Sequence, residues 1–489
     1  MKNSNKQDTQ KNNENTPSIY WHDYETFGAT PQKDRPSQFA GIRTDYDLNI
    51  IGEPLIEYCK PAPDYLPHPE ACLITGITPQ HAQKHGLIEA EFMAKIHAQF
   101  SRPGTCVAGY NSIRFDDEVT RYSLYRNFYD PYEREWQNGN SRWDIIDLVR
   151  ACYALRPDGI EWPLKEDGTP SFKLEHLTVA NGIEHGAAHD ALSDVTATID
   201  LAKLIKTKQP KLFDFFFSLR NKKALLDIID VFNMQPLVHT SSRIPATQGC
   251  TTWVAPMSFH PSNKNAVVCF NLTANPQVLL DLSVEELRER LYTKRVDMVE
   301  GDLPVGLKLV HVNKCPILAP AKTLLPENAA RLGIDREQCL KHLKVLKEHP
   351  ELRDKVAEVF NEQGDFSATT NPDYQLYNGF ISKSDKAKFA VVRDAQPSAL
   401  GALNLEFEDA KFTTMLFRYR ARNWPELLTP SELDSWRKYC QNKLMHGEDN
   451  PSISAEDFML TLENLVHEND GNEKNLNILK SLYHYAQSL

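Results

Sequence analysis

Residues 20–26 (YWHDYET) constrain the possible folds of this chain more than any other segment does. Residues 19–24 mix β-branched and aromatic side chains, which is typical of a strand. Side chains two positions apart in a strand point to the same face, so we expect Asp23 and Glu25 to project together. Two neighbouring carboxylates repel each other unless a cation lies between them, and hard divalent ions such as Mg²⁺ bind carboxylates. The segment therefore indicates a metal site, for which later residues must supply the remaining ligands.

The sequence of roughly the first 200 residues predicts an α/β unit, because three expected strands are followed by alternating strands and helices. The two strands after the first, at 38–45 and 49–60, would extend it into an antiparallel meander. Thr78 and Pro79 have the residue types of a helix N-cap and a first helical position. A further strand is expected at 106–110, and helices are expected at 115–126, 143–155, 172–181 (ended by Gly182) and 191–206.

The character of the sequence changes twice after this unit. Residues 236–272 and 307–312 are rich in strand-forming side chains, which predicts a small β-rich domain. From about residue 335 onward the sequence predicts a mainly helical domain. A chain of 489 residues is also too long for a single core. We therefore expect a disordered tail at 1–17, rich in Asn, Gln and Lys, and three domains at 18–207, 210–360 and 361–489.

Charge and cysteine content narrow the possible classes of function. The formal net charge is −11, so a nucleic acid would have to bind at local cationic patches or through metal ions. The nine cysteines are dispersed and include no CxxC pair, which is typical of reduced thiols. The sequence has no run of about 18 apolar residues that would predict a membrane span, and the tail has no apolar targeting segment. We therefore expect a cytoplasmic protein without membrane contact.

Three later residues can complete the metal site. Asp116 is expected just inside a helix that follows a strand. His189 and Asp194 have the spacing H-x4-D (HDALSD), which puts Asp194 in the first turn of a helix and His189 on the loop before it. A fixed carboxylate suits a metal ligand, and a mobile imidazole with an ordinary pKa near ~6.5 suits a general base.

Asp23, Glu25, Asp116, His189 and Asp194 together resemble the DEDD exonuclease superfamily, in its DEDDh branch. The H-x4-D spacing distinguishes this branch from the sister branch, which carries a tyrosine. Longer motifs are similar to the bacterial exonuclease I family over essentially the whole chain after the tail. They are HDYETFG (22–28), LITGITP (73–79), GYNSIRFDDEVTR (109–121), SRWDIIDLVRACYALRP (141–157), HVNKCP (311–316), QLYNGF (375–380) and YRARN (419–423).

The resemblance implies a fold and a reaction. The fold would be a ribonuclease H-like exonuclease domain, then a small β-rich SH3-like domain and a mainly α-helical C-terminal domain. The reaction would be processive 3′→5′ degradation of single-stranded DNA to nucleoside 5′-monophosphates, in DNA repair and recombination. Two Mg²⁺ ions, replaceable by Mn²⁺, would be held by Asp23 as the bridging ligand with Glu25, Asp116 and Asp194. His189 would take a proton from the attacking water.

Contacts with the DNA strand are suggested by the resemblance and by residue type. Single strands are held by cationic side chains and by aromatic rings on which bases stack. Thr26 and Phe27, with Glu25, resemble the family's pocket for the terminal nucleotide. Further contacts are expected from Arg121, Tyr132, Trp136, Arg150, Lys173 and Lys308. The family tends to carry arginine where this chain has Lys173, which keeps the charge but loses the bidentate geometry.

The resemblance also implies partners and an assembly. The family works as a monomer, encloses single strands in a channel between its domains, and docks the acidic, apolar C-terminal tail of single-stranded DNA-binding protein. Arg418, Arg420 and Arg422, with Tyr419 and Trp424, could serve that docking, or they could pair internally between domains.

Other interpretations of the sequence stay open. An exoribonuclease of the same superfamily would carry the same five residues, because they do not distinguish sugars, although the two extra domains favour the DNA enzyme. A non-catalytic single-strand-binding scaffold would have no need to keep all five. Single residues also have ordinary structural explanations: Asp194, for example, could simply complement a helix dipole.

Overall fold

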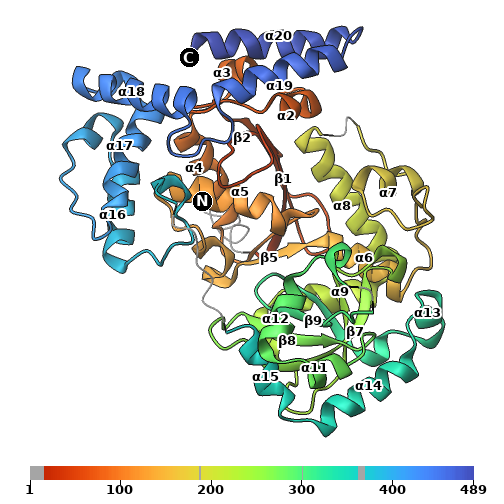
Figure 1. The fold of residues 1–489 in the computed structure, drawn as a ribbon. Helices are drawn as coiled ribbons and strands as arrows, with labels where there is room; N and C mark the ends of the chain where they lie inside the picture. Colours follow the sequence, from red (N-terminus) through yellow and green to blue (C-terminus); the bar gives the residue numbers. More distant parts are fainter. Residues whose placement is uncertain (1–15, 187–188, 300, 362–368) are drawn as a thin grey trace, which may run out of the picture. The chain divides into compact units, whose positions relative to one another are not determined.

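The computed structural model describes residues 16–186, 189–299, 301–361 and 369–489. Almost all of the tail expected at 1–17 lies outside the described residues. The chain divides into two compact units (Figure 1). The first comprises Met1–Ser141, His185–Ile199 and Phe366–Leu489, and the second comprises Arg142–Glu184 and Asp200–Asp365. Among the described helices, none is both long enough and apolar enough to cross a membrane.

A five-stranded sheet carries two of the predicted metal ligands, Asp23 and Glu25. Its strand order is β3-β2-β1-β4-β5. Strand β1 pairs antiparallel with β2 and parallel with β4, and β2 pairs antiparallel with β3. The meander expected from the first three strands is therefore confirmed. The strands are β1 (Ser18–Thr26), β2 (Pro36–Thr44), β3 (Leu55–Tyr58), β4 (Thr105–Gly109) and β5 (Ser141–Asp144), the last of which begins in this unit.

Helices cover this sheet and provide its core. The expected N-cap is confirmed, because the Thr78 hydroxyl accepts a hydrogen bond from the His81 backbone N–H at 3.2 Å and Pro79 opens the helix. Apolar residues of α4 and α5, including Phe92 and Val119, pack against Tyr20 and Tyr24 of β1 in one buried cluster. The helices are α2 (Pro69–Thr75), α3 (Pro79–His85), α4 (Glu89–Phe100), α5 (Asp116–Arg126) and α8 (Ala191–Lys208), with a 3₁₀ turn at Ser112–Arg114.

The C-terminal part of the first unit is helical, as the sequence predicted. Figure 1 shows α19 and α20 in blue beside α2 and α3. One apolar cluster joins Phe27 and Tyr65 to Phe458 and Leu482 of these last helices. A second cluster joins α5 to α16 and α17. The helices are α16 (Lys383–Asp394), α17 (Lys411–Asn423), α18 (Pro430–His446), α19 (Ala455–Glu468) and α20 (Glu473–Ser488).

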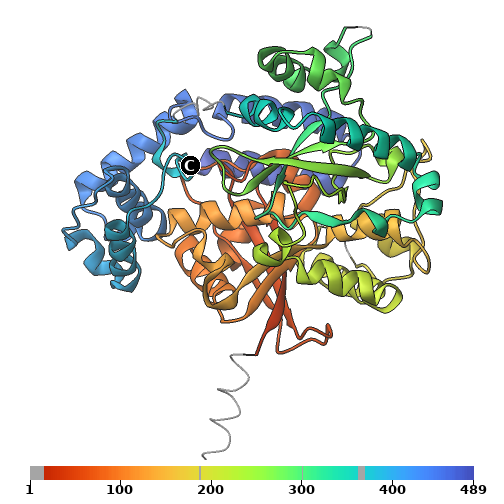
Figure 2. The same ribbon diagram turned by 90° about the horizontal axis from the view of Figure 1, so that it is seen from below.

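The second unit contains the expected β-rich segment. Its sheet has the order β10-β6-β7-β8-β9, and the neighbouring strands pair antiparallel. Figure 2 shows these green strands with the teal helices α14 and α15 beside them. The strands are β6 (Leu237–Thr240), β7 (Thr251–Phe259), β8 (Ala266–Asn271), β9 (Leu307–His311) and β10 (Ile317–Pro320). The α-helices are α6 (Ile145–Leu155), α7 (Leu174–Ala180), α9 (Pro210–Ser218), α10 (Lys222–Leu226), α11 (Gln277–Asp281), α12 (Val284–Tyr292), α13 (Pro326–Arg331), α14 (Arg336–Glu348) and α15 (Leu352–Val359).

Several predicted boundaries were wrong. The third strand covers only Leu55–Tyr58 instead of 49–60, and the helix expected at 172–181 is Leu174–Ala180. The helix expected at 143–155 begins only at Ile145, and Trp143 lies in β5. Asp144 explains the difference, because its carboxylate accepts a hydrogen bond from the Ile146 backbone N–H at 3.0 Å and caps the helix. A cap residue has extended backbone geometry, which lets the preceding residues pair as a strand.

Candidate active site: four carboxylates and a histidine

Strand β1 supplies two acidic side chains to the site. Asp23 is half-buried and Glu25 is 8 % exposed, opposite Ala40 and Gln38 of β2. Asp116 opens α5 and is 5 % exposed, and its Oδ1 accepts a hydrogen bond from the Tyr24 backbone N–H at 3.1 Å. That bond joins the start of α5 to β1 at Tyr24, the residue between Asp23 and Glu25.

Helix α8 and the turn before it supply the other two predicted residues. His189 lies in a turn before the helix, with a positive φ of 66° that non-glycine residues seldom adopt. Asp194 lies in the first turn, and its backbone N–H donates to the Asp190 carbonyl at 3.0 Å. Asp190 caps the helix, since its carboxylate accepts a hydrogen bond from the Ser193 N–H at 3.2 Å.

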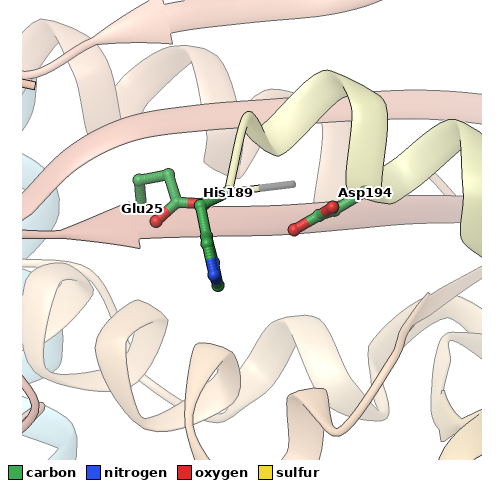
Figure 3. A group of neighbouring side chains, drawn as sticks. All are labelled: Glu25, His189 and Asp194. Carbon is green, nitrogen blue, oxygen red and sulfur yellow. The ribbon is translucent and has the colours of Figure 1, made fainter. Parts of the chain in front are cut away.

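The side chains from β1 and α8 meet. One potential ligand atom from each of Glu25, His189 and Asp194 lies within 4.8 Å of the other two. Figure 3 shows the Asp194 carboxylate pointing from α8 towards Glu25 and His189. Residues far apart in the sequence are therefore brought to one place by the strand and by the entry to the helix.

The pKa shifts show that negative charge in the site is not balanced by the side chains alone. Burial, and then the charges of Asp116, Glu25 and Asp194, raise the pKa of Asp23 well above its ordinary value. Burial, and then Asp194 and Asp116, raise the pKa of Glu25 to about 8. Asp190 contributes to both shifts, and the sequence analysis did not single it out. We refer to Asp23, Glu25, Asp116 and Asp194 as the carboxylate cluster.

The carboxylate cluster fits hard divalent cations. Its donors are oxygen atoms, which Mg²⁺ and Mn²⁺ prefer over nitrogen or sulfur. A divalent cation would also reverse the sign of the local electrostatics, because it favours the ionised form of every carboxylate that now repels its neighbours.

Thr26 and Phe27, expected in a nucleotide pocket, lie at the end of β1. The Thr26 hydroxyl donates to the Gly28 carbonyl at 2.6 Å. Phe27 is 1 % exposed and packs with the C-terminal helices, and its carbonyl accepts a hydrogen bond from the Tyr65 hydroxyl at 3.0 Å. The assignment of Phe27 to the pocket stays a prediction, and it requires the ring to leave this core.

Arg121, Tyr132 and Trp136 lie in the first unit. Arg121 is tightly engaged: its guanidinium donates to both carboxylate oxygens of Glu135 at 2.8 and 3.0 Å and to Glu118 at 2.7 Å. The Tyr132 ring lies under the same guanidinium, 5.3 Å from ring centroid to Cζ. Trp136, by contrast, is 63 % exposed. A phosphate would have to compete with two carboxylates for Arg121, whereas Trp136 offers a ring surface to solvent.

Arg150, Lys173 and Lys308 belong to the second unit. Arg150 donates to Asp147 at 2.5 Å, and its guanidinium lies 5.8 Å from the Phe172 ring centroid. Lys173 is well exposed and lies 3.4 Å from Glu175. Lys308 lies on β9 opposite Cys269. Of the three, Lys173 has the ammonium group most open to solvent in this unit.

The arginines considered for docking a partner's tail form internal ion pairs. Arg418 donates to Asp373 at 3.1 Å and to Asp449 at 2.7 Å. Arg422 donates to Asp373 and to the fully buried Asp64. Arg420 pairs with Glu432 at 2.7 Å. The structure therefore favours the alternative in which this segment joins the C-terminal helices to the N-terminal part of the chain.

His185 was missed by the sequence analysis. Its side chain is 7 % exposed, and its Nε2 lies 2.6 Å from Oδ1 of Asp194. The only sequence signal is a second histidine four positions before His189 (HGAAH), and nothing in that spacing identifies Asp194 as its partner.

Comparisons with known proteins agree with this fold. Family models match in three consecutive parts: Exonuclease at 20–202, Exonuclease I SH3-like domain at 220–362 and Exonuclease I C-terminal domain at 370–489. Exodeoxyribonuclease I of Haemophilus influenzae is 53% identical over 473 residues, which cover 96% of this chain and 98% of that protein.

Solved structures are similar over nearly the full length. Escherichia coli exonuclease I in complex with a dA16 oligonucleotide matches with a TM-score of 0.93 and 50% identity, covering 97% of this chain and 100% of that one. A structure of SSB/exonuclease I in complex with the inhibitor CFAM matches with a TM-score of 0.89 and 49% identity, covering 97% and 99%. The expected family and the expected order of domain types are thus confirmed, and this chain belongs to the exodeoxyribonuclease I family.

Proposed function

We propose that this chain is a metal-dependent, processive exonuclease that degrades single-stranded DNA from the 3′ end to nucleoside 5′-monophosphates. The observation that carries the proposal is the meeting of Glu25, His189 and Asp194 within 4.8 Å, together with Asp23 and Asp116. Burial, and then the neighbouring carboxylates, raise the pKa of both Asp23 and Glu25. Such a site suits a reaction in which divalent cations and a general base act on a phosphodiester.

Asp23, Glu25, Asp116 and Asp194 would hold two Mg²⁺ ions, and Mn²⁺ could substitute. Bound there, the ions would supply Lewis-acid stabilisation of the attacking and leaving oxygens. His189 takes a proton from the attacking water as its oxygen bonds to phosphorus and the bond to the 3′ oxygen breaks. General-base assistance of this kind is typically worth about 10²–10⁴-fold in rate.

The strand itself would be held by aromatic and cationic side chains. Trp136 is the best placed for base stacking, because most of its ring is exposed. Lys173 is the most open cation among those expected to contact phosphate. Arg121, Tyr132, Arg150 and Lys308 are proposed as further contacts, with Glu25, Thr26 and Phe27 nearest the terminal nucleotide. The E. coli relative bound to dA16 supports single-stranded DNA as the substrate class.

Partners and cellular context are inferred from the family. The SSB/exonuclease I structure supports docking of single-stranded DNA-binding protein. We propose that the chain acts as a monomer, with domains at about 18–207, 210–360 and 361–489, in DNA repair and recombination. All nine cysteines are free thiols, which supports a reducing cytoplasm as the site of action.

The experiment is digestion of matched single-stranded DNA, duplex DNA and RNA, each labelled at the 5′ end, with Mg²⁺ or with EDTA. We expect progressive shortening of single-stranded DNA only, lost in EDTA and in His189→Ala. Equal attack on RNA would favour the exoribonuclease, which shares the five residues. Binding without shortening would favour the non-catalytic scaffold.

A further inference from the structure

His185 lies against a member of the carboxylate cluster. Its Nε2–H donates to Oδ1 of Asp194 at 2.6 Å, and both side chains are mostly buried, with 7 % and 20 % of their surfaces exposed. A short bond between a ring N–H and an ionised carboxylate is charge-assisted, and such bonds are stronger than neutral ones. His185 is also distinct from the proposed general base, His189, which follows it in the same loop.

The loop that carries His185 is packed closely on α8. A Cβ placed on Gly186 would lie 3.1 Å from the Ser193 hydroxyl, which is tighter than ordinary contact. Ser193 immediately precedes Asp194 in the first turn of the helix. The backbone after His185 therefore lies against the same turn that presents Asp194, and this proximity limits how far the imidazole can move from the carboxylate.

A carboxylate on a first helical turn can still rotate about its side-chain bonds. Its two oxygens are not held in the orientation that best binds a cation unless another group fixes this rotation. Hydrogen bonds from groups behind the ligands commonly supply that constraint in metal sites, and removing such a group typically lowers metal affinity or activity about 10- to 100-fold.

We propose that His185 is a positioning residue for the metal site: it holds Oδ1 of Asp194 so that the carboxylate faces Glu25 and is ready to bind a divalent cation. This inference rests on the proposed function, since it assumes that Asp194 is a ligand. In this proposal, His185 neither transfers a proton nor contacts the substrate.

The test compares two variants of similar size that differ in whether they can donate a hydrogen bond. His185→Gln keeps an N–H donor at about the reach of Nε2, and His185→Leu removes it. Mn²⁺ affinity of the metal-free full-length protein is measured by electron paramagnetic resonance at one fixed pH, without DNA. We expect His185→Leu to weaken Mn²⁺ binding by about 10- to 100-fold and His185→Gln to restore most of the affinity.

A control variant and two further measurements separate a positioning role from general damage to the fold. His97 is a half-buried histidine of the same unit that is hydrogen-bonded to the Ser101 hydroxyl at 3.0 Å, so His97→Leu is the matched control and should leave Mn²⁺ affinity unchanged. In turnover assays, His185→Leu should require more Mg²⁺ for half-maximal rate and recover most of the rate at saturating Mg²⁺. In a double-mutant cycle, the effect of His185→Leu on Mn²⁺ affinity should largely disappear in the background of Asp194→Ala.

The possible outcomes distinguish this inference from the proposed function. Mn²⁺ affinity of His185→Leu within about twofold of the wild type would overturn the positioning role, because the expected loss is at least tenfold. Equal losses in His185→Gln and His185→Leu would also overturn it. Failure of the wild type to bind Mn²⁺ would overturn the proposed function, and this inference with it.

Discussion

Removing one charge from the carboxylate cluster should stabilise the protein when no metal is present. The change is Glu25→Gln, which keeps the size of the side chain and deletes its charge. In the metal-free protein, burial and the charges of Asp194 and Asp116 raise the pKa of Glu25 from 4.5 to about 8. The folded state therefore binds more protons than the unfolded state between these two values, so its stability falls as pH rises through that window.

The size of the effect follows from the same shift. At about pH 7.5 an unfolded glutamate is fully ionised and the folded one is mostly protonated, which costs the folded state up to about 4 kcal/mol; at about pH 5 the cost is about 1 kcal/mol. Glu25→Gln removes this cost. In EDTA we expect the variant to be more stable than the wild type, by a margin about 3 kcal/mol larger at the higher pH.

Urea unfolding in EDTA at the two pH values, followed by circular dichroism, measures this difference. The matched control is Glu57→Gln on β3, where the carboxylate pairs with Lys95 at the surface and its loss should cost at most about 1 kcal/mol at either pH. In excess Mg²⁺ the order should reverse, because only the wild type gains stability from binding. The reasoning would be refuted if Glu25→Gln were no more stable than the wild type at about pH 7.5 in EDTA. The carboxylate cluster would then not destabilise the metal-free fold.

Asp194→Ala should abolish turnover of 5′-labelled single-stranded DNA while leaving its binding in EDTA largely intact; comparable loss of both would remove Asp194 from its assigned role. Asp64→Asn should lower the free energy of unfolding by about 3–5 kcal/mol, because it leaves Lys443 buried without its carboxylate and leaves Arg422 paired with Asp373 alone. Burial would raise the pKa of Asp64, but Arg422 and Lys443 hold it well below its ordinary value. This contribution to stability should therefore decline progressively as the pH falls below about 4. Trp136→Ala should weaken single-stranded DNA binding by about 1–3 kcal/mol in a fluorescence titration, whereas Tyr483→Ala on α20 should not.

Local patterns were enough to find the proposed catalytic residues. The alternation in β1 gave the shared direction of Asp23 and Glu25, and the H-x4-D spacing gave the positions of His189 and Asp194 on either side of a helix start. Both are properties of a few adjacent residues, which local backbone geometry controls. Their roles remain predictions until they are tested by mutation.

Features that depend on distant partners could not be predicted. Nothing near Phe27 in the sequence reveals that its ring packs against helices at the other end of the chain. The sequence suggests Arg121 as a DNA contact, but it does not reveal that Glu135 and Glu118 bind the guanidinium. The role proposed for His185 likewise depends on its 2.6 Å contact with Asp194, which the spacing of residues in the sequence does not reveal.

The cluster around Phe27 also has a consequence for how the protein is made. Ile478, Leu479 and Leu482 of α20 belong to the same buried group as Phe27, which follows the metal-binding strand directly. A ribosome adds about 5–20 residues per second, so roughly 20–90 seconds separate the synthesis of these two parts. The buried group around Phe27 is complete only after α20 has left the ribosome, so we expect this end of the site to become fully ordered late in a newly made chain.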